Sequence, residues 1–148
     1  MRLLPFFLLL VAAVGCRGTQ AYSSTDLQQV RQAYRIIPPV YRAFKAAYYG
    51  GNTRVMLKEY AREKKVCRLV DVVDRRDTID PNTNLFAASA GLDSLCNDVE
   101  SAYAGWAIKH HYPYDKSIVP SRPQDAFVDG DANLEKMPAQ MEHPKAYP

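Results

Sequence analysis

The chain has 148 residues, of which 47% are hydrophobic and 24% are charged, and its formal net charge at pH 7 is +3. A chain of this size forms one domain with a modest core, which excludes a multidomain architecture.

The first 21 residues have the pattern of a secretory signal peptide. A positive start is followed by the apolar run Leu3–Val14, which is too short to span a bilayer, and Thr19-Gln20-Ala21 offers small residues for cleavage. A second possible cut before Cys16 would instead produce a lipoprotein. No other segment is apolar enough to enter a membrane. We expect a soluble, secreted, extracellular protein whose mature chain begins at Tyr22.

The three cysteines are divided by this cleavage. Cys16 leaves with the signal peptide, and Cys67 and Cys96 remain. Two thiols in an exported protein most often pair, so we expect a Cys67–Cys96 disulfide.

The mature chain opens with two predicted helices. Thr25-Asp-Leu-Gln28 has the form of a capping box, and apolar residues then recur at helical spacing as far as Ile37. Pro38-Pro39 is expected to end this helix and open a second, short one over Val40–Tyr49. Gly50-Gly51 is expected to end the second helix.

Two longer helices are predicted over residues 53–75 and 85–110, joined by a turn at Asp80–Thr83. If they form an antiparallel hairpin, residues whose numbers sum to about 163 lie at the same level. Cys67 then faces Cys96, and a bridge between them stabilises the fold by roughly 3–4 kcal/mol.

The same register places Tyr60 opposite Tyr103. Gly91 and Gly105 in the fourth helix lower its intrinsic stability but allow a neighbour to approach closely. These features predict an all-α, four-helix bundle-like domain over residues 22–112.

The remaining segment, residues 113–148, is rich in proline and lacks a sustained apolar stripe. It is expected to be an extended or disordered tail, with Ile118, Val119 and Phe127 as the residues that could pin part of it to the helices. Truncation after Tyr114 should then leave the stability nearly unchanged.

The sequence contains no convincing catalytic or metal-binding constellation. It has neither a Gly-x-Ser-x-Gly elbow nor a phosphate-binding glycine loop, and no free thiol is expected in the mature chain. The run Asp129–Glu135 resembles a calcium loop, but Leu134 and Gln140 stand where glycine and glutamate are needed. His110 and His111 are adjacent and would point apart on a helix. We therefore expect no enzyme, no metal and no cofactor.

A basic segment with interleaved tyrosines is the most informative functional feature. From Arg31 to Arg68 the chain has ten basic residues against Glu59 and Glu63. Tyrosine and arginine often anchor protein interfaces. The alternative is that the tyrosines belong to the core and the cations only keep the surface soluble. The predicted partner-binding residues are Arg31, Arg35, Tyr41, Arg42, Lys45, Tyr48 and Tyr49.

The expected secretion of the protein limits the partners that its basic segment can meet. A basic surface could bind nucleic acid, but outside the cell a host plasma protein with an acidic surface, or a sulfated polysaccharide, is expected instead. The alternative function is that of a carrier for a small apolar ligand between the helices. Its pocket would be lined by Phe44, Tyr60, Phe86 and Trp106.

The segment RQAYRIIPPVYRAFKAAYY and the Cys67–Cys96 span resemble the mosquito salivary anophensin and albicin family of secreted proteins. This resemblance covers residues 22 to about 112. It implies a helical, non-enzymatic inhibitor of host defence that acts on contact-phase coagulation and kinin release or on the alternative complement pathway.

Overall fold

A computed structural model describes residues 22–73, 79–80 and 82–142, with the side chains of 71–73 outside the description. Its elements are all helices, which confirms the predicted all-α class. The predicted signal peptide lies outside the described residues. The helices are α1 (Ser24–Tyr49), α2 (Thr53–Val66), α3 (Arg68–Val73), α4 (Asn84–His110) and α5 (Val128–Glu142).

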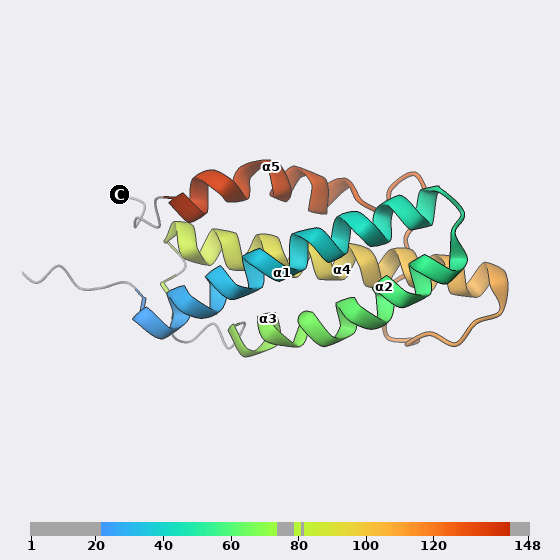
Figure 1. Ribbon diagram of the computed structural model, residues 1–148, viewed down its shortest axis with the longest axis horizontal. Coiled ribbons are helices and arrows are strands. Elements are labelled where there is room, and N and C mark those ends of the chain that lie inside the picture. The colour runs from blue at the N-terminus through green and yellow to red at the C-terminus, as the bar shows by residue number, and fades with distance from the viewer. Residues whose placement is uncertain (1–21, 74–78, 81, 143–148) are drawn as a thin grey trace, which may run out of the picture.

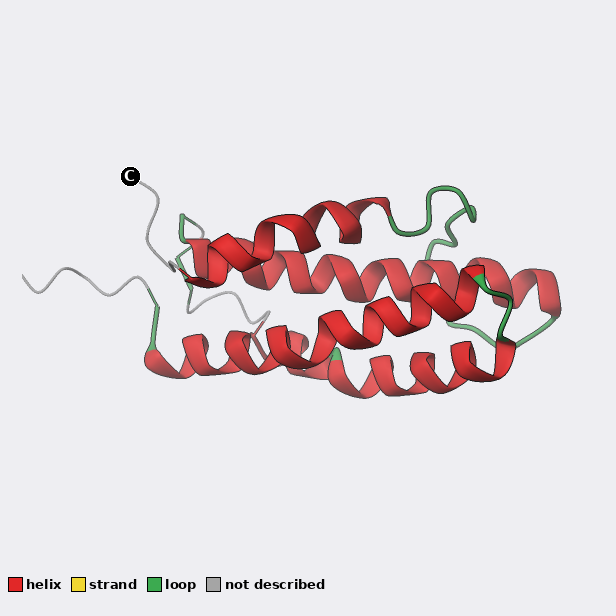
Figure 2. Ribbon diagram, turned by 45° about the horizontal axis from the view of Figure 1, so that its top comes forward, coloured by secondary structure: helices red, strands yellow, loops and turns green. Residues whose placement is uncertain are grey.

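The helices run side by side along the long axis of the molecule (Figure 1). In both ribbon views α2 and α3 form one arm on one side of the bundle, and α5 lies on the opposite side, against α4 (Figure 2). Helices α1 and α4 lie between these two sides, and their inward faces supply most of the core. The four-helix arrangement is therefore made by α1, the α2–α3 arm, α4 and α5.

The N-cap of helix α1 lies two residues before the predicted one. Its cap is Ser23, whose hydroxyl oxygen accepts the backbone N–H of Asp26, while the Asp26 carboxylate accepts the backbone N–H of Ser23. This reciprocal pair satisfies two donors that the first helical turn leaves free. The predicted box at Thr25 is wrong, because Asp26 lies three residues after Ser23 and completes a capping box two residues earlier in the chain.

The prediction that Pro38-Pro39 divides this segment is also wrong, since α1 continues through both prolines. Each proline removes a backbone donor and disfavours the helical conformation of the residue before it. Burial outweighs this cost: Ile37 before the prolines and Val40 and Phe44 after them are all almost fully buried. One continuous helix places these residues in the same core.

The predicted third helix is divided near its middle. Helix α2 ends at Val66, and Cys67 stands between it and α3 with a backbone that is still helical. The Cys67 N–H donates to the carbonyl of Glu63 and its carbonyl accepts from Val70, so the interruption is slight. The part of the prediction from residue 74 to residue 75 lies outside the described residues.

The hairpin and its register are confirmed. Cys67 and Cys96 form a disulfide with Cα atoms 6.0 Å apart. About two helical turns further along, the rings of Tyr60 and Tyr103 stack with centroids 3.6 Å apart. The turn is closed by Asp80, which accepts hydrogen bonds from residues 82 and 83. Antiparallel helices keep the same rise per residue, so one correct pair fixes the others.

The predicted extended or disordered tail over residues 113–148 is wrong for residues 128–142. Residues 113–127 contain no helix, as predicted, and residues 143–148 lie outside the described residues. Residues 128–142 form helix α5, and Phe127 and Met137 are almost fully buried. Gly91 of α4 lies against Met137, and a Cβ added at Gly105 would come within 2.5 Å of the Ser121 carbonyl oxygen. The predicted close approach at both glycines therefore serves this segment. Val119, by contrast, is 80% exposed.

Candidate functional site

Four of the predicted partner-binding residues contact the chain's own C-terminal segment, and two of them, Tyr41 and Lys45, contact Asp131. Tyr41 is buried, and its hydroxyl lies within hydrogen-bonding distance of Asp131 Oδ1, at 3.1 Å, and of the Phe127 carbonyl oxygen, at 3.2 Å. Burial and the Asp131 carboxylate raise the pKa of Tyr41, so this hydroxyl remains a hydrogen-bond donor. Lys45 forms an ion pair with the same Asp131 carboxylate.

Tyr48 and Tyr49 lie around the same docked segment. The Phe127 ring is 5.4 Å from the ring of Tyr48 and 5.5 Å from that of Tyr49, centroid to centroid. The Tyr49 hydroxyl donates to the Pro123 carbonyl oxygen at 3.0 Å, although Tyr49 is 56% exposed. Among the four tyrosine and lysine positions predicted to bind a partner, Tyr49 retains the most surface.

The three predicted arginines of α1 all face solvent. Arg31, Arg35 and Arg42 are exposed, whereas the apolar residues between them are turned into the core. At 100° per residue these arginines and Tyr49 fall within about 40° of one another around the helix axis. They form a stripe along α1, called here the α1 stripe: Arg31, Arg35, Arg42 and Tyr49.

Helix α2 carries a second row of cations, which the sequence analysis did not select as site residues. These residues lie at positions i, i+4, i+8 and i+11, so they share one face of the helix, and all are exposed. The spacing of these cations in the sequence already indicated a shared outer face, because Met56 and Tyr60 lie on the opposite face of the helix. Both of these residues are buried in the structure. The row, called here the α2 stripe, consists of Arg54, Lys58, Arg62 and Lys65.

The carboxylates of the basic segment that carries both stripes are buried. Residues 24–70 contain three acidic side chains, Asp26, Glu59 and Glu63, and all three are buried. Burying a carboxylate costs free energy unless hydrogen bonds or cations compensate it. Arg62 lies 3.6 Å from the Glu59 carboxylate and provides part of this compensation.

The segregation of charge leaves the exposed charged residues of 24–70 uniformly positive. They are Arg31, Arg35, Arg42, Arg54, Lys58, Arg62, Lys64, Lys65 and Arg68. Such a surface attracts anionic partners at a distance of up to a Debye length and raises their association rates.

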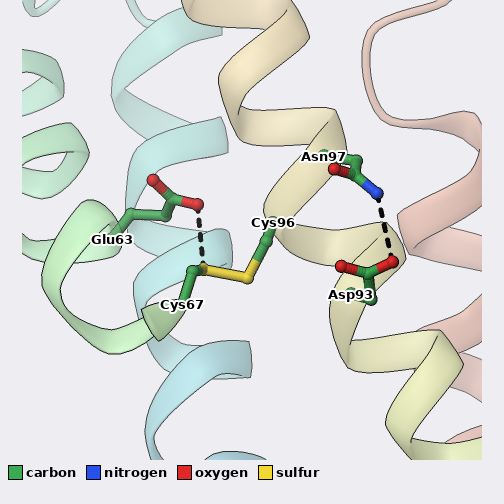
Figure 3. The surroundings of a disulfide bond; sticks show 5 residues. All are labelled: Glu63, Cys67, Asp93, Cys96 and Asn97. Carbon is green, nitrogen blue, oxygen red and sulfur yellow. Dashed lines mark hydrogen bonds between the residues drawn. A yellow bond between two sulfur atoms is a disulfide. The ribbon is translucent and has the colours of Figure 1, made fainter. Parts of the chain in front are cut away.

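Glu63 lies beside the disulfide. Its Oε1 atom is 2.9 Å from the Cys67 sulfur, the contact drawn in Figure 3. Within the described ranges, Glu63, Cys67 and Cys96 are the one group of side chains with metal-ligand spacing. Sulfur binds metals as a thiolate, and both sulfurs are here joined to each other. The oxidised site therefore provides no thiolate ligand.

The residues predicted to line a carrier pocket are packed against other side chains. Phe44 is fully buried, with the rings of Tyr60 and Phe127 within 6.3 Å of its centroid. One surface hollow lies along the outer side of α1 and another lies beside the disulfide. Neither of these two is lined by Phe44, Tyr60, Phe86 or Trp106. The carrier function stays a prediction.

Comparisons with protein families, with curated proteins and with solved structures found no match to this chain. Within the described ranges, none of the helices combines the length and the apolar character that a bilayer span requires. The charges and contacts of the chain itself are therefore the observations that bear on its function.

Proposed function

We propose that this protein is a secreted, non-enzymatic inhibitor that binds an acidic surface of a host plasma protein through the α1 stripe. The observation that carries the proposal is the uniformly positive exposed charge of residues 24–70, with every acidic side chain of this range buried. The Cys67–Cys96 disulfide supports an oxidising, extracellular destination.

The α1 stripe has the composition of a small protein interface. Its three arginines present planar, multidentate donors that match carboxylates. Tyr49 adds an exposed aromatic ring at one end of the row, held by its hydrogen bond to Pro123. Charged rim residues mainly set the association rate, and an aromatic anchor mainly sets the dissociation rate. The two parts of the stripe can therefore be tested separately.

The family resemblance names the pathways in which to look for the target. We propose contact-phase coagulation with kinin release as the first, and the alternative complement pathway as the second. A pull-down from plasma with the mature protein identifies the bound component, and clotting and complement assays then show which pathway is inhibited.

Surface binding kinetics on the captured plasma protein test the site. Arg31→Gln, Arg35→Gln and Arg42→Gln combined should slow association about tenfold at low salt, and the difference should shrink as salt is added. Tyr49→Ala should leave association unchanged and accelerate dissociation by about tenfold.

A matched control removes three exposed cations elsewhere, with Lys109→Gln, Lys116→Gln and Lys136→Gln. It changes the net charge by the same amount and should affect association far less. Equal slowing by both triple variants, with unchanged circular dichroism, would leave general charge as the cause and contradict a site on α1.

A further inference from the structure

The α2 stripe differs from the α1 stripe in what accompanies its cations. Helix α2 lies along an outer edge of the bundle (Figure 1), and the four cations of its stripe are all exposed. Its aromatic residue, Tyr60, is buried and stacked on Tyr103. Its two glutamates, Glu59 and Glu63, are also buried. What remains on the outer face is a row of cations with one exposed apolar side chain, Val55, beside it, and without an aromatic anchor or a carboxylate.

This arrangement does not follow the usual pattern of a solvated helix, in which glutamates pair with cations three or four residues away on the surface. Of the four cations of the stripe, Arg62 alone forms an ion pair with a residue in the described ranges, and its partner is the largely buried Glu59. The positive charge of Arg54, Lys58 and Lys65 is therefore available to a ligand.

The spacing of the row defines the shape of that ligand. Side chains one helical turn apart lie about 5–6 Å from each other, and the helix rises about 16 Å over the eleven steps from Arg54 to Lys65. A straight row of point charges matches a linear polyanion, whose repeated charges can meet successive cations. A compact protein surface would instead require the apolar or aromatic contacts that give interfaces their energy.

We infer that the α2 stripe is a binding site for a linear sulfated polysaccharide, separate from the protein-binding α1 stripe. The ligand is held by its sulfate groups, each placed between neighbouring cations of the row. Binding releases the counterions condensed on the polyanion, as it does for proteins on nucleic-acid phosphates, so the affinity depends steeply on salt. The site would keep a secreted inhibitor on cell-surface or matrix glycans.

Heparin is the probe for this site, with binding measured by calorimetry at several salt concentrations. The variant Arg54→Gln, Lys58→Gln and Lys65→Gln removes three cations and leaves the Arg62–Glu59 pair intact. At physiological salt it should bind heparin at least about tenfold more weakly, and the slope of log affinity against log salt should fall by about two to three.

The α1 triple variant is the matched control, because it removes the same charge from the neighbouring helix. It should weaken heparin binding much less than the α2 variant does, while the α2 variant should leave the plasma-protein kinetics nearly unchanged. This crossed design separates the two proposals, because each variant is expected to lose one activity and to keep the other.

Three results would overturn the inference. The first is equal loss of heparin affinity in the α1 and α2 triple variants, each with the circular dichroism and melting temperature of the parent. The second is binding of hyaluronan, which carries carboxylates but no sulfates, as tight as that of heparin. The third is tighter binding of duplex DNA than of heparin at the same salt concentration.

Discussion

The two sides of α1 carry similar residues and meet different surroundings. On one side Tyr41 and Lys45 contact Asp131, and Tyr48 packs on Phe127, so these residues hold the chain's own C-terminal segment. On the other side the arginines of the α1 stripe contact solvent. Tyrosines and cations interleaved along a helix can thus form a core, a surface or both. What distinguishes the two sides is the position of residues that are distant in sequence.

The C-terminal segment is therefore part of the core, because Phe127 and Met137 are almost fully buried. The expectation that truncation after Tyr114 leaves stability unchanged is replaced by the opposite one, because truncation would expose the aromatic cluster of α1 and the inner face of α4. The predictions that follow test the docked side of α1, from the largest expected effect to the smallest.

The largest effect is expected at Phe127. Its ring lies within about 6 Å of four aromatic rings of α1. Phe127→Ala should destabilise the protein by about 3–5 kcal/mol, since it creates a cavity in a packed cluster. Chemical unfolding followed by circular dichroism measures this. Val119→Ala, at an exposed position of the same segment, is the control and should change stability by less than about 0.5 kcal/mol.

A substitution at Gly130 tests how closely α5 approaches. A Cβ there would lie 2.6 Å from the Tyr41 hydroxyl oxygen and 2.7 Å from Asp98 Oδ2. Gly130→Ala should cost about 1–3 kcal/mol, although alanine normally favours a helix, because the added methyl group has no space. Thermal unfolding provides the measurement. Stabilisation by this change would contradict the docked position of α5.

The pH dependence of stability should report on Asp98, which accepts the Gly130 N–H at 2.7 Å. Burial is the main cause that raises the pKa of Asp98 to about 6; the charges of Asp129 and Asp131 add to the increase, and the Gly130 N–H and Lys45 oppose it. The folded state therefore binds a proton more tightly than the unfolded chain, in which the pKa is near 4. Stability from this group is fully present below about pH 4 and is lost as pH rises through about 6.

Comparison with Asp98→Asn isolates this contribution, because the amide oxygen can still accept the Gly130 N–H. The stability difference between the two proteins should change by about 1 kcal/mol between pH 4 and pH 7, a value reduced for the solvent screening of a half-exposed group. Unfolding midpoints measured at both pH values give the difference. A constant difference across this range would show that Asp98 titrates as it does in the unfolded chain.

The smallest effect is expected from removing the Tyr41 hydroxyl. Tyr41→Phe keeps the buried ring and loses the polar contacts with Asp131 and Phe127. It should cost about 1 kcal/mol, the usual net value of one hydrogen bond. If Tyr41 instead anchored an external partner, the variant would weaken partner binding and leave the unfolding free energy unchanged. Measuring both quantities on one variant distinguishes the two roles.

Much of the α2–α4 hairpin could be predicted because it depends on local spacing. Apolar periodicity located α4 nearly to the residue, and a single register placed Cys67 beside Cys96 and Tyr60 on Tyr103. The rise per residue is the same in both helices of the hairpin, so the positions of the turn and of the two cysteines were sufficient to predict which residues face each other. The exposed arginines of α1 followed from the same periodicity.

The sequence by itself determined the all-α class, the disulfide and the inward and outward faces of the long helices, since these depend on residues within a few turns of one another. Tertiary structure alone decided that α1 continues through Pro38 and Pro39, that residues 128–142 form a helix, and that Tyr41 is a core residue. In each case a contact between distant segments outweighs an unfavourable local preference. Burying Phe127 and Met137 against α1 and α4 supplies free energy that a proline-rich, weakly amphipathic segment lacks when it is considered alone.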